Sequence, residues 1–240
     1  MIGPILSLGL TAFESNQDLW VHLVNTVFPI YVSNTLLLFV GVLTLSAGLG
    51  ISTAWIVTYY SFIGKRVVEW ALILPLACPA YIIAYVYTDF LEYAGPVQGL
   101  VRHFFDFNSA SDYYFPEIRS VPGAIFVMGF VLYPYVYILA RTGFKNSPRS
   151  LYETAMLYGR NKFLAVGLPL CRPYIVVGLA LVAMEVLSDF GTVEYFSVQT
   201  LTLGMFNVWI GMNSISAASQ IATVTFVFII ILLVLERKAR

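Results

Sequence analysis

Charge is the property that this sequence has least of. Only 11% of its 240 residues are Asp, Glu, Lys or Arg, against about 25% in a typical soluble domain. The 13 basic residues equal the 13 acidic ones in number, so the net charge is zero and nucleic acid is not an obvious partner. Hydrophobic residues make up 59% of the chain, and the mean hydropathy is +0.82. These proportions are typical of a protein that lies in a lipid bilayer.

Cysteine and histidine are also scarce, which argues against several kinds of site. The two cysteines, Cys78 and Cys171, lie in or beside apolar segments and offer neither a disulfide framework nor metal-ligand spacing. The two histidines, His22 and His103, are far apart in the sequence. We therefore expect no metal site and no cofactor.

Motifs of common catalytic sites are missing as well. The sequence has no Gly-x-x-x-x-Gly-Lys-Ser/Thr loop to cradle a nucleotide phosphate and no His-Glu-x-x-His metal motif. We therefore expect that the chain is not an enzyme and that any ATP hydrolysis linked to it occurs on another polypeptide. An intramembrane enzyme remains an alternative, as does a carrier that works without nucleotide.

Long apolar runs are what the sequence does contain. A helix needs about 20 mostly apolar residues to cross a bilayer. Five runs meet or approach this length: 34–58, 68–90, 121–141, 173–190 and 218–235. The run 1–13 is too short and resembles the outer half of a spanning helix. We predict an all-α fold, a polytopic membrane helix bundle with about five full spans and a partial N-terminal one, forming a single domain over residues 1–240.

The basic residues are distributed unevenly, and their distribution predicts the orientation. Eleven of the thirteen fall in three regions that alternate correctly with the predicted spans. These are Lys65 and Arg66; Arg141, Lys145, Arg149, Arg160, Lys162 and Arg172; and Arg237, Lys238 and Arg240. Because loops rich in Lys and Arg stay in the cytoplasm, we expect the 142–172 loop and the C-terminus to be cytoplasmic.

The 142–172 loop carries signals of a short helix. Either Ser147 caps a helix with Pro148 in its first turn, or Ser150 and Glu153 form a capping box. Gly159 suits the position after the last turn. A second, turn-rich piece leads to Pro173, which we expect in the first turn of the next span. Without further signals, an ordinary basic loop explains the segment equally well.

The order of residues in this loop resembles a known motif. Glu153-Thr154-Ala155-x-x-x-Gly159, followed by Leu168-Pro169, is similar to the EAA loop of binding-protein-dependent ATP-binding-cassette (ABC) importer permeases. In that family the short helix docks on the ATP-hydrolysing subunit and transmits its closure to the membrane helices. The resemblance implies that these six residues couple the chain to an ATPase. Thr154 replaces the usual Ala, and the interval before Leu168 is about three residues shorter than usual.

Five further stretches look like the ferric-iron importer permeases of this family: 75–89, 94–98, 114–120, 133–137 and 188–196. Such permeases commonly join two homologous halves, and this sequence looks like the first half starting late. The resemblance implies the bacterial plasma (inner) membrane, a second permease half (homologous or identical), two ABC ATPase subunits, an extracytoplasmic (periplasmic) substrate-binding protein and ferric iron as substrate. Related permeases carry thiamine, polyamines or sulfate.

Three acidic residues in and just after the 173–190 span are the remaining candidates for functional residues. Glu185 and Asp189 lie one helical turn apart and predict one polar face of the 173–190 span. A carboxylate at mid-bilayer costs about 2.5–3.5 kcal/mol, so we expect that face to be shielded from lipid. Together with Glu194, they are candidates for the translocation pathway or its outer gate. Alternatively, they are protonated or bonded to helix ends at a subunit interface.

Overall fold

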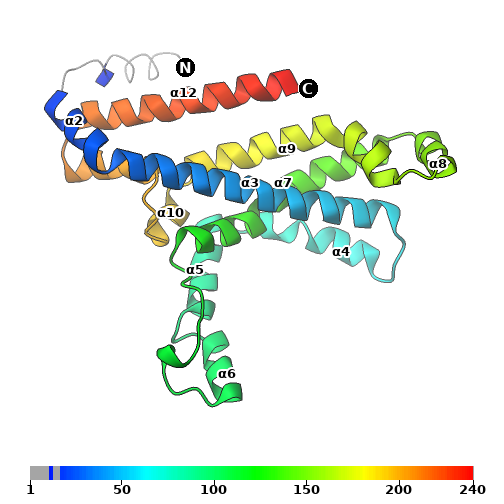
Figure 1. Ribbon diagram of the computed structural model, residues 1–240, viewed down its shortest axis with the longest axis horizontal. Helices are drawn as coiled ribbons and strands as arrows, with labels where there is room; N and C mark the ends of the chain where they lie inside the picture. The colour runs from blue at the N-terminus through cyan, green and yellow to red at the C-terminus, as the bar shows by residue number, and fades with distance from the viewer. Residues whose placement is uncertain (1–10, 13–16, 240) are drawn as a thin grey trace. The chain divides into compact units, whose positions relative to one another are not determined.

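The computed structural model describes residues 11–12 and 17–239, and all regular structure in this part of the chain is helical (Figure 1). The longer helices are α3 (Phe28–Tyr59), α7 (Val121–Asn146), α9 (Leu168–Ser188) and α12 (Ile215–Ala239). The shorter ones are α2 (Gln17–Thr26), α4 (Lys65–Ala71), α5 (Ala80–Leu91), α6 (Pro96–Phe105), α8 (Arg149–Leu157), α10 (Gly191–Tyr195) and α11 (Leu201–Phe206). Single turns form η1 (Leu74–Ala77), η2 (Ala110–Asp112), η3 (Phe163–Gly167) and η4 (Asn207–Gly211).

Three helices are long and apolar enough to cross a membrane, namely Phe28–Tyr59, Val121–Asn146 and Phe163–Ser188. They contain most or all of the predicted runs 34–58, 121–141 and 173–190. The third begins ten residues before Pro173, so that proline lies inside α9 and not in its first turn as we expected. The expected partial span over 1–13 falls almost wholly outside the described residues.

The remaining two predicted spans are the runs 68–90 and 218–235. The run 68–90 is broken, and Lys65–Ala77 and Ala80–Phe105 count as one span only when taken together. Cys78 at the break has an extended backbone, as a residue before proline prefers, and Pro79 cannot donate a backbone hydrogen bond. The run 218–235 lies within the helix α12, whose apolar part is described over Ile215–Ile231. The described residues thus hold three or up to four candidate spans, where we predicted about five.

The chain divides into two compact units. Unit 1 comprises Met1–Gly41, Pro79–Met128 and Val186–Ile229, and unit 2 comprises Val42–Cys78, Gly129–Glu185 and Ile230–Arg240. Helices α3, α7, α9 and α12 each contribute residues to both units.

Unit 2 is held together by close contacts among α3, α7 and α9. A Cβ atom on Gly50 would lie 2.7 Å from the Cβ atom of Val136, and one on Gly178 would lie 2.9 Å from the Cα atom of Val136. The two glycines therefore let α3 and α9 approach the α7 backbone closely, as small residues do in membrane helix pairs. An ion pair between Arg141 and Glu69 joins α7 to α4.

Unit 1 has its own core where α2 and the first half of α3 meet α11 and α12. Leu23, Tyr31, Leu201 and Ile221 are buried there. The hydroxyl of Thr35 accepts a hydrogen bond of 3.0 Å from the backbone N–H of Leu201, at the start of α11. Between α9 and α12, residues 191–214 form only short helices and turns.

Candidate coupling site and candidate gate

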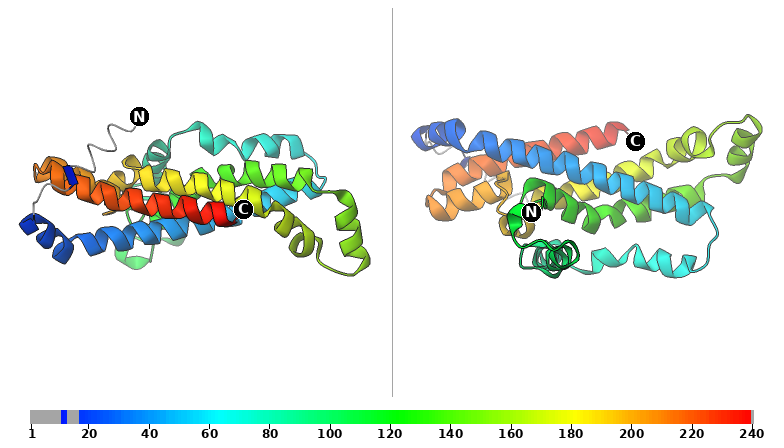
Figure 2. Two further views of the ribbon diagram at one scale, coloured as in Figure 1. Left: turned by 90° about the horizontal axis from the view of Figure 1, so that it is seen from above. Right: turned by 60° about the horizontal axis from the view of Figure 1, so that its bottom comes forward.

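Helix α8 lies at one end of unit 2, next to the end of α7, and the further views show the same placement (Figure 2). It begins after Pro148, whose extended backbone occupies the capping position without a side-chain hydrogen bond. Neither predicted cap forms. Ser147 donates its hydroxyl hydrogen bond back to the carbonyl of Gly143, and Thr154 donates to the carbonyl of Ser150.

The end of α8 agrees with the prediction for Gly159. Gly159 has φ +63°, and its N–H donates to the carbonyl of Met156 at 3.0 Å. The N–H of Arg160 donates to the carbonyl of Ala155 at 2.9 Å. This pair of bonds is the Schellman arrangement, in which a residue with positive φ closes the last turn.

The two faces of α8 differ in what they touch. Tyr152 and Ala155 are buried within unit 2, so Ala155 is not available to a docking partner. Glu153 and Thr154 are exposed on the opposite face. Large apolar side chains are exposed as well, and the sequence analysis missed them: Leu151, Met156, Leu157 (87% exposed) and Tyr158 (79% exposed). An exposed apolar patch with a polar rim marks an interaction surface.

Leu168 and Pro169 lie at the start of α9. The segment before them is helical and not turn-rich as predicted. The side-chain oxygen of Asn161 accepts hydrogen bonds from the N–H groups of Phe163 (2.9 Å) and Leu164 (3.4 Å), and a π-helical turn follows. Leu168 packs against the hydrophobic core cluster that includes Tyr152, whereas Pro169 is exposed. The six predicted coupling residues therefore belong to one unit, but only part of them face outward.

A pocket of about 490 Å³ adjoins the first turn of α8. Three cationic side chains line it, from Lys145, Arg149 and Lys162, together with the carboxylate of Glu153. The ammonium of Lys162 lies 5.6 Å from the ring centre of Tyr59. This excess of positive charge favours an acidic group on whatever approaches α8.

Glu185 and Asp189, predicted to share one face of the 173–190 span, do not lie on one helix. Glu185 lies in the last turn of α9 and accepts a hydrogen bond from the hydroxyl of Tyr135 at 3.4 Å. Asp189 lies beyond the end of α9, because that helix ends at Ser188. Its carboxylate accepts hydrogen bonds from the N–H (2.7 Å) and the hydroxyl (2.8 Å) of Thr192. Asp189 is thus bonded to the start of α10, as in the structural alternative that we considered.

Glu194 lines a pocket of about 520 Å³ between α5 and α10. The same pocket is lined by Tyr81, Tyr85 and Tyr195, and the rings of Tyr85 and Tyr195 are 5.7 Å apart. None of its six lining residues is basic. Phenol and carboxylate oxygens are hard donors that suit hard cations.

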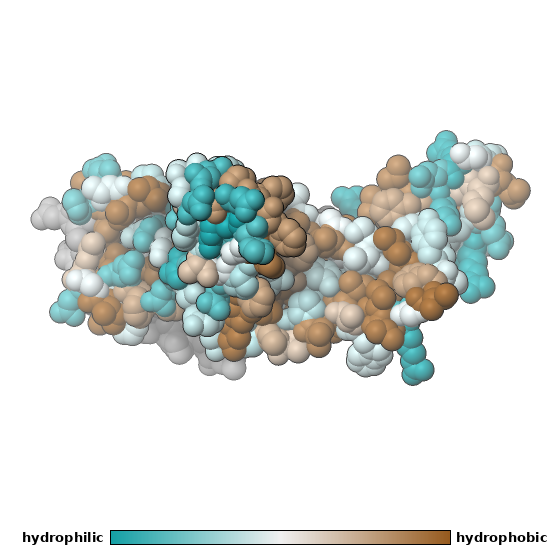
Figure 3. All heavy atoms as spheres, turned by 90° about the horizontal axis from the view of Figure 1, so that it is seen from below, coloured by the Kyte–Doolittle hydropathy of each residue, from teal (hydrophilic) through white to brown (hydrophobic). Residues whose placement is uncertain are grey.

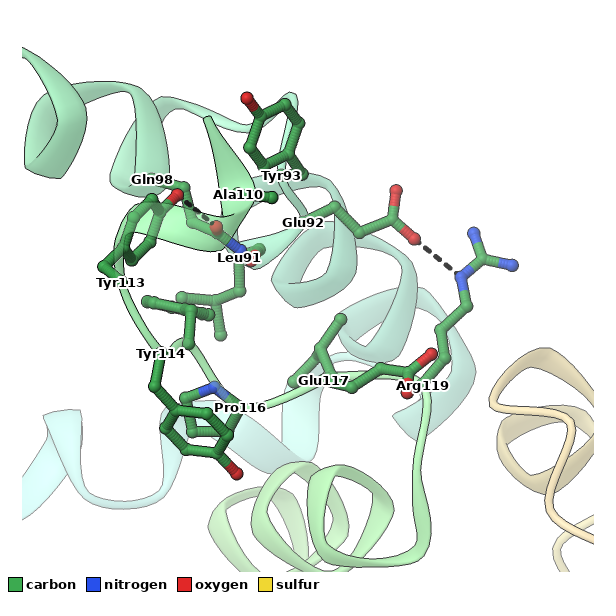
Figure 4. A pocket seen from close by; sticks show the side chains of 12 residues that line it. Leu91, Glu92, Tyr93, Gln98, Ala110, Tyr113, Tyr114, Pro116, Glu117 and Arg119 are labelled. Carbon is green, nitrogen blue, oxygen red and sulfur yellow. Dashed lines mark hydrogen bonds and ion pairs between the residues drawn. The ribbon is translucent and has the colours of Figure 1, made fainter. Parts of the chain in front are cut away.

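The loop after α6 forms a second structured feature of unit 1, with a pocket of about 370 Å³ (Figure 4). The buried amide of Gln98 donates to the carbonyl of Leu91 (2.7 Å) and accepts from the hydroxyl of Tyr113 (2.6 Å). Across the pocket, Arg119 and Glu92 form an ion pair of 2.6 Å. This hydrogen bond to Glu92 raises the pKa of the Arg119 guanidinium.

Hydrophilic and hydrophobic surfaces lie side by side on this part of unit 1 (Figure 3). Asp112 organises the hydrophilic part, since its carboxylate accepts 2.8 Å hydrogen bonds from the N–H groups of Asn108 and Ser109. The backbone hydrogen bonds from Ser109 and Asn108 lower the pKa of Asp112. The sequence analysis did not predict these hydrogen bonds between Asp112 and the backbone of Asn108 and Ser109. Among the side chains that the structure describes, no three of His, Cys, Asp or Glu lie close enough to hold a metal ion.

Comparison with known proteins assigns the chain to a family. The family model for the binding-protein-dependent transport system inner membrane component matches residues 46–237. An Fe(3+)-transport system permease protein of Haemophilus influenzae is 26% identical over 204 residues, which are 83% of this chain and 36% of that protein. The molybdenum transport system permease protein of the same organism is 26% identical over 171 residues, or 68% of this chain and 71% of the relative.

A solved structure shares the fold. A bacterial alginate ABC transporter, in complex with an alginate pentasaccharide-bound periplasmic protein, superimposes with a TM-score of 0.77 and 18% identity over 100% of this chain and 86% of that one. The chain spans about a third to a half of the length of the first curated relatives it matches. Because the family model covers most of the sequence, the chain belongs to the family of binding-protein-dependent transport system inner membrane components.

Proposed function

We propose that this chain is a permease subunit of an ATP-driven importer, and that α8 is the surface on which an ABC ATPase docks. The observation that carries this proposal is the exposure of Glu153, Leu157 and Tyr158 on a short helix closed by Gly159. The exposed apolar side chains supply area that a partner can bury, and the cationic pocket beside them favours an acidic rim on that partner. ATP is hydrolysed on the ATPase, and the resulting movement of the ATPase is transmitted to α8.

The remaining partners follow from the same proposal. A second permease half, homologous or identical, completes the membrane part, and an extracytoplasmic binding protein delivers the substrate. The distribution of basic residues supports a cytoplasmic position for residues 142–172 and the C-terminus. The whole described chain then works as a single transmembrane domain.

Ferric iron is the substrate that we propose. The iron-transport relative aligns with 83% of this chain, and the pocket beside Glu194 offers phenol and carboxylate oxygens without a basic residue in its lining. In this proposal Glu194 belongs to the translocation pathway or its outer gate. Glu185 and Asp189, which lie nearby in the sequence, are candidates for the same role. An oxyanion is the alternative, since the molybdenum transport relative is equally similar over a shorter alignment; sulfate, thiamine and polyamines are further candidates.

Capture of the ATPase tests the docking proposal. The variants Leu157→Asp and Glu153→Ala/Gly159→Val remove the exposed apolar side chain or the carboxylate together with the closing turn. We expect each to lower the affinity for the purified ATPase by about 30-fold or more, the loss typical of an interface hot spot. Tyr114→Ala, on the exposed loop after α6, is the control and should bind normally. Unchanged capture by both α8 variants would contradict the proposal.

Uptake measurements test the substrate. Cells that contain the complete transporter are expected to accumulate radioactive iron, and excess molybdate, sulfate, thiamine or spermidine should not compete. Glu194→Gln should reduce iron uptake without lowering ATPase capture. Accumulation of molybdate but not iron would replace the iron proposal with the oxyanion alternative and leave the docking proposal intact.

A further inference from the structure

Five aromatic rings form a cluster between α8 and the membrane helices of unit 2. The five-ring cluster consists of Trp55 and Tyr59 from α3, Phe144 from α7, Tyr152 from α8 and Phe163 from η3. The rings thus come from α3, from the end of α7 and from both halves of the coupling loop.

Trp55 is the centre of the five-ring cluster. Its ring centre lies 4.0 Å from that of Tyr59, 4.9 Å from Phe163, 5.2 Å from Phe144 and 6.2 Å from Tyr152. It is the member with a ring contact to each of the other four. Two of these four pairs, those with Phe144 and Phe163, are edge-to-face, the arrangement that aromatic quadrupoles favour.

Three rings of the cluster are buried. Trp55 is 9% exposed, Tyr152 5% and Phe144 1%. On the far side of Trp55, a Cβ atom on Gly167 would lie 2.7 Å from the indole ring, so that even a methyl group has no room there. Around Trp55 and Gly167 this close packing transmits displacement, because side chains there cannot absorb movement into empty space; Tyr59, Phe144 and Tyr152 also border the pocket beside α8.

We propose that Trp55 is a positioning residue that makes the orientation of α3, α7 and the start of α9 depend on that of α8. This inference rests on the proposed function, in which an ATPase moves α8. The inward face of α8 contacts the five-ring cluster through Tyr152, while its outward face is free for the partner. A tilt of α8 therefore displaces Tyr152, and Trp55 passes the displacement to three elements at once.

A smaller side chain at position 55 should leave ATPase binding unchanged but lower the amount of substrate transported per ATP. In the complete transporter, reconstituted with ATPase and binding protein in proteoliposomes, Trp55→Leu should capture the ATPase normally. Substrate taken up per ATP hydrolysed should fall by about 2- to 30-fold, the range for residues that carry coupling between sites. Trp55→Phe keeps one ring and should recover most of this ratio. Trp70→Leu, which changes a 72% exposed tryptophan on α4, should leave the ratio unchanged.

The outcome of this experiment is separable from that of the docking test. Loss of ATPase capture by the α8 variants concerns the proposed function, whereas the Trp55 variants are compared only by transport per ATP. An unchanged ratio in Trp55→Leu would overturn the inference. If that variant does not reach the membrane, Phe163→Leu and Phe144→Leu each remove one ring and should lower the ratio in the same direction; normal ratios in both would also overturn it.

Discussion

At the residue scale, two glycines in α3, Gly48 and Gly50, differ in whether the structure has room for a Cβ atom. Gly50 faces Val136 on α7, where a Cβ atom would approach the backbone nitrogen of Tyr137 to 2.9 Å, whereas Gly48 has nothing within 4 Å. We expect Gly50→Ala to lower stability by about 1–3 kcal/mol through overpacking. Gly48→Ala should be neutral or stabilising, since alanine favours a helix by up to about 1 kcal/mol. Thermal unfolding of the two variants in detergent measures the difference; equal melting temperatures would contradict the close approach.

The Asp112 carboxylate makes a pH-dependent prediction at the same scale. Its pKa is lowered in the folded loop, so its contribution to loop order is fully present above the ordinary pKa of 3.8 and is lost as the pH falls through the lowered value. A fluorophore on Tyr114→Cys, in a background without exposed Cys78, reports the order of the loop. Its anisotropy should fall only below about pH 4. With Asp112→Asn it should be low at neutral pH too; the same acid transition in that variant would exclude Asp112 as the cause.

At the scale of elements, Asp189 tests whether a partly buried carboxylate serves a helix end or a transport path. As the acceptor for two hydrogen bonds from Thr192, it should be replaceable by Asn, which keeps one acceptor oxygen. Asp189→Ala should cost about 0.5–2 kcal/mol, the loss typical of a helix cap. Iron uptake by Asp189→Asn, compared with its melting temperature, separates the two roles. We expect Asp189→Asn to keep both its stability and its iron uptake. Normal stability with abolished uptake would instead assign the negative charge of Asp189 to the transport pathway.

The same element scale shows why the sequence predicted some features and not others. The runs 34–58 and 121–141 lie in helices long and apolar enough to span a membrane, because continuous apolar sequence leaves the backbone no partner but itself. The run 68–90 looked similar but contains Cys78-Pro79, where local geometry overrides composition. Gly159 could be assigned because positive φ strongly favours glycine. The exposure of Leu157 and Tyr158 could not, since a nine-residue helix has too few turns for its apolar pattern to reveal which face is covered.

At the scale of the whole molecule, the functional proposal depends on which residues face the cytoplasm. Residue 162 lies in the segment that should meet the ATPase, and residue 114 lies in a loop on the opposite side of the predicted topology. Single cysteines placed by Lys162→Cys and Tyr114→Cys, with Cys78→Ser as background, can be labelled with a membrane-impermeant maleimide. Buried Cys171 should remain unreactive in folded protein.

In intact cells we expect position 114 to react once the reagent passes the outer membrane, and position 162 to react only after the inner membrane is permeabilised. The asymmetry follows from the basic residues around 142–172, which the translocation machinery retains inside. Labelling of position 162 from outside would put α8 beyond the reach of any cytoplasmic ATPase, and the docking surface, the cationic pocket and the role of Trp55 would all lose their basis. Labelling of both positions only after permeabilisation would leave α8 accessible to the ATPase but require a different number of crossings between residues 114 and 162. The topology experiment therefore tests the premise that every other prediction about α8 shares.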